Sequence, residues 1–416
     1  MLARFTTWMH GAALGVLAAA FFGGCGHQQA IDFHRPLPEG AVALRKIPPQ
    51  EYPDFGQQPI DPPRLKQAID NSLKYLGTIS SQAFYPYLDI THDRAVATLL
   101  RLRQICDLQQ QRGTWDGAWF NQQIVENFEV YQSIGAPAPD GSGYTDRVLF
   151  TGYCTPIYDA SLSRSAAFPW PLYKLPADLL RDPATGQVFG RKNAQGQIVP
   201  YYTRGEIETG GKLAGDELVW LKSRWEAYVV TIQGSARLRL SETGQIYEIG
   251  FAGTNGYPYT SPGDQMVADG VIMQDQHSLK GLSAYFAAHP EMMDRYLPLN
   301  QRYVFFTQRT GGPFGSLNVP VTPMASIATD KENRDIYPRA MPAFVCVDVP
   351  DETGVAFGPL RAFLMDQDTG GAIRASGRCD IYMGVGPSAQ ARAGHETQEG
   401  SLYYLAIKPE LMPSAK

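Results

Sequence analysis

Apolar positions recur with helical spacing in the first part of the chain. They predict helices over residues 63–77, 93–110 and 120–132, with His92 and Asp93 as a cap for the second. In the second helix, Ala95, Leu99, Leu102 and Ile105 or Cys106 would face inward. The first helix would bury Leu65, Ala68, Ile69, Leu73 and Leu76. The N-terminal part of the folded region should therefore be a small helical layer.

From Arg147 onward the pattern changes to short β-type runs flanked by Gly, Pro or Asn. A helical patch over 277–289 interrupts them. Because helices precede strands of uneven length, we expect a mainly β protein with helices, in the form of two β-barrels decorated with helices. The predicted strands cover residues 148–153, 228–233, 237–240, 246–251, 303–306, 343–349, 358–366, 378–383 and 401–407.

The N-terminus is typical of an export signal. Arg4 is followed by an apolar run over 12–22, which is short for a membrane span and ends in Phe-Gly-Gly before Cys25. We expect cleavage before Cys25 and attachment of a lipid to it; the alternative is ordinary signal cleavage with an unmodified cysteine. Residues 27–63 are polar and rich in proline, which favours a linker between membrane and folded body.

Composition narrows the function. The 416 residues include 41 Gly, 31 Pro, 22 Tyr and 19 Phe, which fits a β-rich globular protein, and the net charge of -5 lacks the basic footprint of a nucleic-acid-binding protein. No CxxC pair or histidine spacing indicates a metal site, and no cofactor is expected. The remaining cysteines are Cys106, Cys154, Cys346 and Cys379. Cysteines of an exported protein can form disulfides, but the sequence does not choose a pairing, and these four are equally compatible with free thiols.

Acidic residues gather in the C-terminal third. The stretch over 366–373 reads Asp-Gln-Asp-Thr-Gly-Gly-Ala-Ile, and Asp380 follows between Cys379 and Ile381. In a strand, Asp380 would point away from those two neighbours, and therefore toward solvent or a groove if they face a core. This direction makes Asp380 a candidate site residue.

This acid-rich segment resembles the 3D domain, which is named for its aspartates. Five further motifs follow one another between residues 147 and 407: Thr-Gly-Tyr-Cys-Thr-Pro at 151–156, Ile-Gln-Gly-Ser-Ala-Arg at 232–237, Gly-Phe-Ala-Gly-Thr-Asn-Gly-Tyr at 250–257, Asn-Gln-Arg-Tyr at 300–303 and Val-Thr-Pro at 321–323. Together and in this order, they resemble the membrane-bound lytic murein transglycosylase A family. The chain departs from the family pattern at Cys154, where a second tyrosine is frequent, and over 225–228.

The resemblance implies a double-psi β-barrel with a second β-barrel-like domain inserted into it and a groove between them. Mapped onto this chain, residues 1–24 would be the signal peptide and 25–62 the lipid-anchored linker. The helices and the catalytic barrel would take 63–165 and 295–416, and the inserted domain 166–294.

The implied activity is that of a peptidoglycan lytic transglycosylase, a carbon–oxygen lyase. It would cleave the β-1,4 bond between N-acetylmuramic acid and N-acetylglucosamine and leave 1,6-anhydromuramyl ends, with exo or endo action open. The implied setting is the cell envelope, with a monomer held by its lipid in the outer membrane and facing the periplasm. Its partners would be glycan strands and the membrane, and no nucleic acid.

A single carboxyl group can suffice for this reaction. The resemblance implies one catalytic aspartate, whose position matches Asp380, and the substrate's own C6 hydroxyl as the nucleophile. A hydrolase ordinarily uses two carboxyl groups, but with this nucleophile Asp380 could protonate the leaving oxygen and then accept the hydroxyl proton. We expect a raised pKa for Asp380 from burial beside Cys379 and Ile381. Asp368 is the second candidate, either in the reaction or as a partner of the Gly370–Gly371 turn. Asp366 should be a solvated residue.

Other side chains are candidates for substrate binding, each against a plainer structural role. Tyr382 could stack on a sugar, although an aromatic in a strand is more often core, and His395 should lie in a surface loop. Gln233 and Arg237 could bind sugar or carboxylate groups instead of serving a tight turn. The full set of binding candidates is Tyr153, Thr155, Gln233, Arg237, Gly370 and Gly371.

Three other functions compete. The Asp-Thr-Gly triplet at 368–370 resembles that of aspartic proteases, which need two, and the chain has one. A non-catalytic peptidoglycan-binding lipoprotein would not need Asp380. A two-carboxylate glycoside hydrolase would pair Asp380 with Asp366, Asp368 or Glu396.

Overall fold

The fold is taken from a computed structural model that describes residues 31–38, 40–182, 186–331, 336–413. The predicted signal peptide, Cys25 and the first residues of the predicted linker lie outside these ranges. Within them, every helix is too short or too polar to span a membrane.

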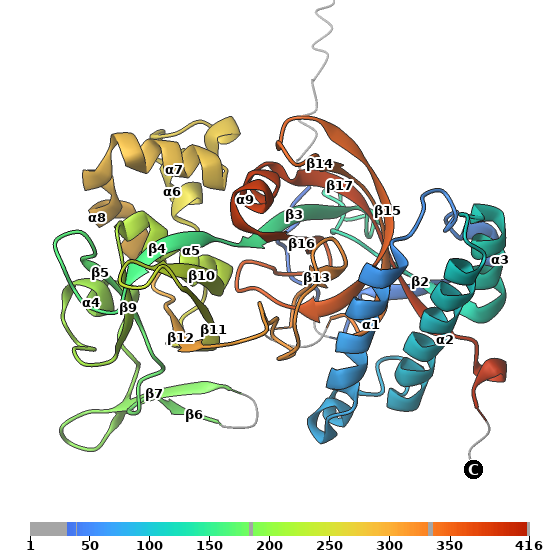
Figure 1. Cartoon of the computed structure of the whole chain (residues 1–416), viewed down its shortest axis with the longest axis horizontal. Coiled ribbons are helices and arrows are strands. Elements are labelled where there is room, and N and C mark those ends of the chain that lie inside the picture. Colours follow the sequence, from blue (N-terminus) through green and yellow to red (C-terminus); the bar gives the residue numbers. More distant parts are fainter. Residues whose placement is uncertain (1–30, 39, 183–185, 332–335, 414–416) are drawn as a thin grey trace, which may run out of the picture. The chain divides into compact units, whose positions relative to one another are not determined.

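The first sheet closes into a barrel (Figure 1). β17 pairs with β14 and also with β3, so six strands in the order β17-β14-β15-β13-β16-β3 form a ring. β2 pairs with β17 outside the ring, and β1 pairs with β2. The strands are β1 (Leu44–Ile47), β2 (Phe128–Ser133), β3 (Val148–Thr155), β13 (Ser326–Ala328), β14 (Pro342–Pro350), β15 (Phe357–Asp368), β16 (Arg378–Val385) and β17 (Thr397–Ile407).

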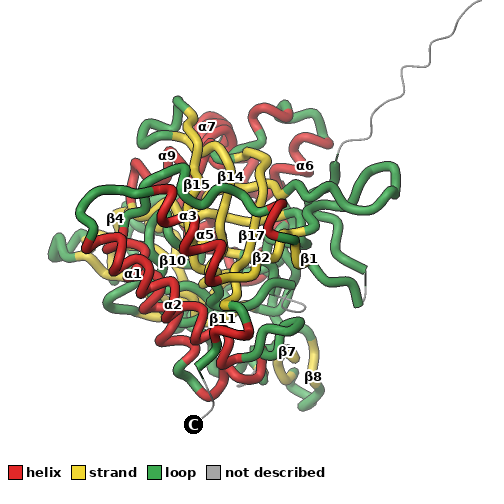
Figure 2. Tube along the Cα trace, turned by 90° about the vertical axis from the view of Figure 1, so that its right-hand side faces the viewer, coloured by secondary structure: helices red, strands yellow, loops and turns green. Residues whose placement is uncertain are grey.

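Three helices cover part of this barrel: α1 (Pro62–Leu76), α2 (His92–Gln111) and α3 (Gly117–Asn127). Figure 2 shows α1 and α2 side by side, and contacts join α1 to β15 and α2 to β17. Each helix begins at a side-chain cap, in turn Asp61, Thr91 and Asp116. The predicted apolar faces are confirmed, since the inward positions of α1 and α2 join the barrel core.

A second sheet follows β3 along the chain. Its order is β12-β11-β10-β4-β9-β5, and a bridge between Lys174 and Phe306 joins its two edges. Helix α5 (Arg224–Gln233) contacts β5, β9, β10 and β12. The strands are β4 (Ile157–Ser161), β5 (Trp170–Tyr173), β9 (Glu217–Leu221), β10 (Ser235–Leu240), β11 (Ile246–Thr254) and β12 (Val304–Gln308).

Smaller elements decorate the second sheet. A three-stranded sheet consists of β6 (Leu180–Arg181), β7 (Val188–Lys192) and β8 (Ile198–Val199). The short helices are α4 (Arg204–Thr209), α6 (Pro262–Ala268), α7 (Leu279–Ala288) and α8 (Met293–Tyr296), while α9 (Gly386–His395) packs on β3 and β16 of the barrel. Short 3-10 helices occupy Pro49–Glu51, Ile79–Phe84, Gln274–Gln276, Pro290–Met292, Leu297–Leu299 and Pro409–Leu411.

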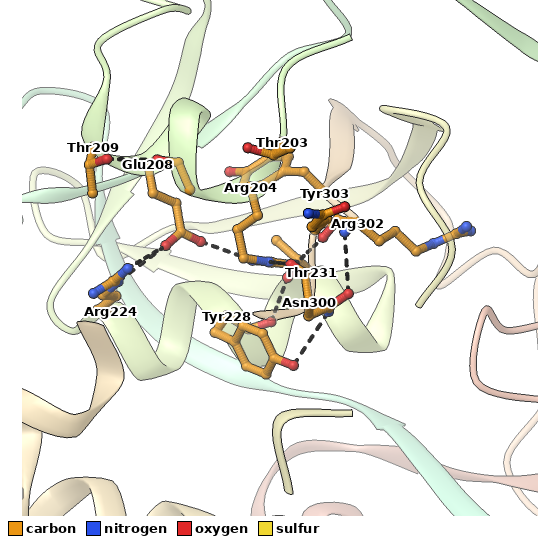
Figure 3. A network of polar contacts seen from close by, with 12 residues as sticks. Thr203, Arg204, Glu208, Thr209, Arg224, Tyr228, Thr231, Asn300, Arg302 and Tyr303 are labelled. Carbon is orange, nitrogen blue, oxygen red and sulfur yellow. Dashed lines mark hydrogen bonds and ion pairs between the residues drawn. The ribbon is translucent and has the colours of Figure 1, made fainter. Parts of the chain in front are cut away.

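A buried arginine ties the second sheet to its helices (Figure 3). The Arg204 guanidinium donates to the carbonyl oxygens of Asn300 and Arg302, to the Thr231 hydroxyl and to the Glu208 carboxylate. It also lies over the rings of Tyr228 and Tyr303, at 4.7 and 5.3 Å from their centroids. One side chain thus links α4, α5 and the segment before β12.

Some local predictions were wrong. Residues 228–233 form the end of α5 rather than a strand, because Ser223 caps a helix start and Gly234 ends it in the left-handed region at φ 73°. Residues 128–133 are β2 rather than the end of the third helix, and Thr91 replaces His92 and Asp93 as the cap of α2. His395 ends α9 and is not in a loop.

The expected class, mainly β with helices and two β-barrel-like sheets, is confirmed. By sheet membership, β4 and β12 belong with the second sheet, and β1, within the predicted linker, buries Leu44 and Ile47 in the barrel core. The four described cysteines are free thiols, so the open question of their pairing is answered for the described residues.

Candidate active site

Asp380 is the third residue of β16, which lies between two neighbouring strands. Its backbone pairs with Thr151 of β3 on one side and Ala328 of β13 on the other. Cys379 and Ile381 are fully buried in the barrel core, and Asp380 points to the opposite face, as the strand alternation predicted. Those apolar neighbours are therefore not the surroundings of the carboxylate.

The Asp380 carboxylate is held by two donors at one oxygen. The Thr151 hydroxyl donates to Oδ1, and Nη2 of Arg378 lies 3.2 Å from the same atom. Arg378 Nη2 also donates to the Thr151 oxygen at 3.0 Å. Among the described residues, Oδ2 has no hydrogen-bond partner, and 15% of the side chain is exposed. One oxygen is thus fixed, while the other can meet a ligand.

Asp368 is the second carboxylate on this face. It ends β15 and pairs with Ala328 across from Asp380. Its Oδ1 accepts the backbone N–H groups of Ser316 and Thr369, both at 2.8 Å, and not those of the Gly370–Gly371 turn. Burial raises its pKa to about 6, although these N–H groups favour the ionised form. Asp368 therefore changes charge near neutral pH.

Tyr153 lies close enough to both carboxylates for their charges to act on its hydroxyl. Its ring packs against Tyr382 at 5.1 Å between centroids, and burial, followed by the charge of Asp368, raises the pKa of its hydroxyl. That hydroxyl is buried, and no described group completes a hydrogen bond of normal geometry with it. Thr155 lies deeper, with its hydroxyl 2.9 Å from that of Tyr382. Tyr382 itself is 1% exposed, as expected for a core aromatic.

The prediction that Asp366 is solvated was wrong. A register shift at Gln367 turns Asp366 inward, and its side chain is fully buried. Lys331 Nζ lies 2.5 Å from Oδ1, and the hydroxyls of Thr329 and Tyr404 donate to Oδ2. This carboxylate is completely engaged inside the barrel and is not available as a partner for Asp380.

Gln233 and Arg237 lie where the second sheet meets β3. The Gln233 Oε1 atom accepts the Cys154 N–H at 3.0 Å, which uses that side chain to join α5 to β3. Arg237 pairs with Glu248 at 2.7 Å. A shallow pocket beside them is shared by both barrels and is lined by Thr155, Ala236, Arg237, Glu248, Ile249, Gly250, Arg309, Gly312, Pro313 and Phe314.

The two glycines after Asp368 allow close packing of a loop. A side chain at Gly371 would lie 3.0 Å from Nε of Arg302, and the Gly370 carbonyl accepts the Ile373 N–H. Neither glycine hydrogen-bonds to Asp368 or Asp380. Within the described ranges, His, Cys, Asp and Glu side chains do not come together in threes as a metal site requires.

Sequence analysis missed Thr151, Arg378 and Lys331. Strand parity could have found Thr151, which lies two residues before Tyr153 on the same face of β3. Parity could also have found Arg378, two residues before Asp380. Lys331 left no such signal, because the register shift in β15 decides which acid faces it.

Two family models match this chain. One is described as the MltA specific insert domain and matches residues 149–307, from the second residue of β3 to the fourth residue of β12. The other is the 3D domain and matches residues 325–406, which contain Asp368 and Asp380. The two models thus coincide with the second sheet and with the acid-bearing strands of the barrel.

Curated relatives and solved structures agree with these models. Membrane-bound lytic murein transglycosylase A of Vibrio cholerae is 27% identical over 278 residues, which are 66% of this chain and 70% of the relative. The Escherichia coli K12 protein of the same name is also 27% identical, over 279 residues and with the same coverage of both chains. A membrane-bound lytic murein transglycosylase from Agrobacterium tumefaciens superposes with a TM-score of 0.70, at 24% identity, over 88% of this chain and 98% of that one. An E. coli MltA structure with bound chitohexaose gives 0.64, at 22% identity, over 92% and 97%.

Proposed function

The chain belongs to the membrane-bound lytic murein transglycosylase A family and carries its 3D domain, and we propose that it cleaves the glycan strands of peptidoglycan without water. The bond cleaved is the β-1,4 bond between N-acetylmuramic acid and N-acetylglucosamine. The products carry 1,6-anhydromuramyl ends.

Asp380 is the proposed acid and base, and the arrangement of its two oxygens carries this assignment. Thr151 and Arg378 fix Oδ1, so Oδ2 is the atom that can hold a proton toward the substrate. It gives that proton to the oxygen of the leaving N-acetylglucosamine as the glycosidic bond breaks. The C6 hydroxyl of the muramyl residue then attacks its own C1 and returns its proton to Oδ2, which restores the enzyme.

Asp368 has a supporting part in this proposal. Asp368 holds the loop at Ser316 by its hydrogen bond, and the charge that it gains near pH 6 lies on the same face as Asp380. The glycan would lie along this face toward Thr155 and the pocket at Arg237. The 3D barrel and the inserted sheet would form the two walls of the groove. The barrel itself would have the double-psi topology.

A two-carboxylate hydrolase is the second candidate, favoured by the raised pKa of Asp368 on the face of Asp380. Digestion of purified peptidoglycan with the protein, followed by mass spectrometry, separates the two. Anhydromuramyl ends support the transglycosylase, and reducing muramyl ends with incorporated water overturn it in favour of hydrolysis. If the glycan strands stay intact, both enzymatic proposals are overturned in favour of a non-catalytic peptidoglycan-binding protein.

We also propose that Cys25 carries the lipid anchor that holds the enzyme in the cell envelope, at the outer membrane. The basis is the apolar run and the Phe-Gly-Gly that precede Cys25. Labelled fatty acid should be incorporated into the wild-type chain and not into Cys25→Ala. Equal labelling of both chains, or of neither, contradicts the anchor.

A further inference from the structure

The described N-terminal segment reaches the strand that carries Asp380. The Nε2 atom of His34 lies 3.1 Å from Nη1 of Arg378, although His34 as a residue is exposed. The backbone also comes close, because a Cβ at Gly377 would lie 3.1 Å from the Phe33 carbonyl oxygen. Leu37 packs against the barrel core. The segment therefore docks beside the site through backbone, apolar and polar contacts.

This contact defines the charge state of His34. A guanidinium nitrogen only donates, so Nε2 must accept, which requires a neutral imidazole with its proton on Nδ1. Burial of the ring and the charge of Arg378 lower the pKa of His34, and three carboxylates oppose this effect: Asp32 in the same segment, Asp264 of α6 and Asp380. These are the charged groups that act on the imidazole from the surrounding elements.

Arg378 in turn reaches the reacting carboxylate. Its Nη1 is engaged by His34, and its Nη2 donates to Asp380 Oδ1 and to Thr151. The Nε atom is buried and has no partner among the described residues. Loss of His34 would leave a second donor of this buried guanidinium unpaired, and its orientation would then be set by Asp380 and Thr151 alone.

We propose that His34 is a positioning residue that holds Arg378 against Asp380 and makes the reaction sensitive to the protonation of its imidazole. The inference rests on the proposed role of Asp380. Protonation of Nε2 removes the acceptor and places two cations face to face. Activity should therefore fall as the pH drops through the pKa of His34, in addition to any effect of the carboxyl groups.

The kinetic test uses the full chain with His34→Ala and His34→Gln. Because His34 acts through Arg378 and not on the glycan, His34→Ala should lower kcat with KM unchanged, by roughly tenfold, since ångström-scale misplacement costs up to about a hundredfold. His34→Gln keeps an acceptor that does not titrate, so it should restore kcat and extend the active range to lower pH. His289→Ala, at an exposed histidine directly after the last residue of α7, is the control and should match wild type.

Two outcomes overturn the inference. One is a wild-type kcat and pH profile in His34→Ala. The other is a loss of kcat that His34→Gln does not restore, accompanied by a lower melting temperature in both variants, which would mean a structural contact only.

A second measurement does not depend on the reaction. Nitrogen NMR of the His34 imidazole should report the Nδ1–H tautomer and a lowered pKa in the wild-type protein. The pKa should rise in Arg378→Gln, because that variant removes the positive charge beside the ring. An unchanged His34 titration in that variant overturns the contact. If Asp380→Asn kept its activity, the proposed role of Asp380 would be overturned, while the NMR result on the contact between His34 and Arg378 would still stand.

Discussion

Asp368 and Asp380 approach the same residue, Ala328, from its two sides, because β15 and β16 both pair with β13. Their side chains therefore share one face of the barrel, with their backbones two strand spacings apart, roughly 9–10 Å. Both carboxylates contribute to the raised pKa of Tyr153. The type of reaction depends on whether Asp380 alone transfers the proton or whether both carboxylates take part in catalysis.

The proposed mechanism predicts unequal parts. Asp380→Asn should fold normally and lose activity by about 10²–10⁴-fold, because it removes the only group that carries the proton. Asp368→Asn keeps the oxygen that accepts from Ser316 and Thr369, so its loss should be clearly smaller. Release of anhydromuramyl products from peptidoglycan measures both; equal losses would point to the two-carboxylate hydrolase.

We predict from the buried carboxyl group of Glu396 that the free energy of unfolding depends on pH. It is 1% exposed, its Oε2 has no partner among the described residues, and burial raises its pKa to about 8. The folded state then binds more protons than the unfolded state between about pH 4.5 and 8, so stability falls as the pH rises through that range. Glu396→Gln should remove this loss and stabilise the protein by on the order of 3 kcal/mol at pH 8.

Melting temperatures at several pH values test this. The two proteins should differ most at pH 8, and the difference should be nearly gone at pH 4.5, where Glu396 is protonated in the folded state and about half protonated in the unfolded state. A parallel pH dependence in the variant would show that Glu396 is not the group responsible. Glu410→Gln, in an exposed turn, is the matched control.

The ion pair inside the barrel predicts strong coupling. The side chains of Lys331 and Asp366 are 2% and 0% exposed. Lys331→Met should destabilise the fold by about 3–5 kcal/mol, because it leaves a buried carboxylate without its cation. The double variant with Asp366→Asn should recover part of that loss. Denaturant unfolding of the four proteins gives the coupling, and additive effects would contradict it.

Arg204 predicts that lysine cannot replace arginine in the second sheet. Its planar fork serves four acceptors at once, and an ammonium group cannot reach all of them. Arg204→Lys should cost about 2–4 kcal/mol, from buried acceptors left unpaired. Thermal unfolding measures it beside Arg103→Lys, an exposed residue of α2 that should change stability by less than about 0.5 kcal/mol.

Sequence periodicity predicted the elements that have one apolar face. It gave α1 and the C-terminal strands, because one face of each lies in the barrel core. It failed over 228–233, where a run of β-branched residues favours a strand, yet α5 is completed by caps at both ends and by contacts with strands of both sheets. Tertiary packing overrode local preference there.

The site could be predicted only as far as strand alternation reaches. Asp380 was placed on the outer face by the burial of its two neighbours, and the same rule put Asp366 beside Asp368 as a surface residue. The extra residue at Gln367 broke that rule and buried Asp366. Contacts between distant segments, such as His34 with Arg378, leave no mark in local pattern.

The closure of the barrel by β17 also bears on how the protein folds. Thr397 of β17 pairs with Thr151 of β3, 246 residues earlier (397 minus 151), and the whole second sheet lies between them in the chain. Such a distant pairing pays its loop-closure entropy before it gains contacts, which makes folding slow. The ring that orients Asp380 can form only after the last strand has emerged, so a growing chain would remain inactive until then.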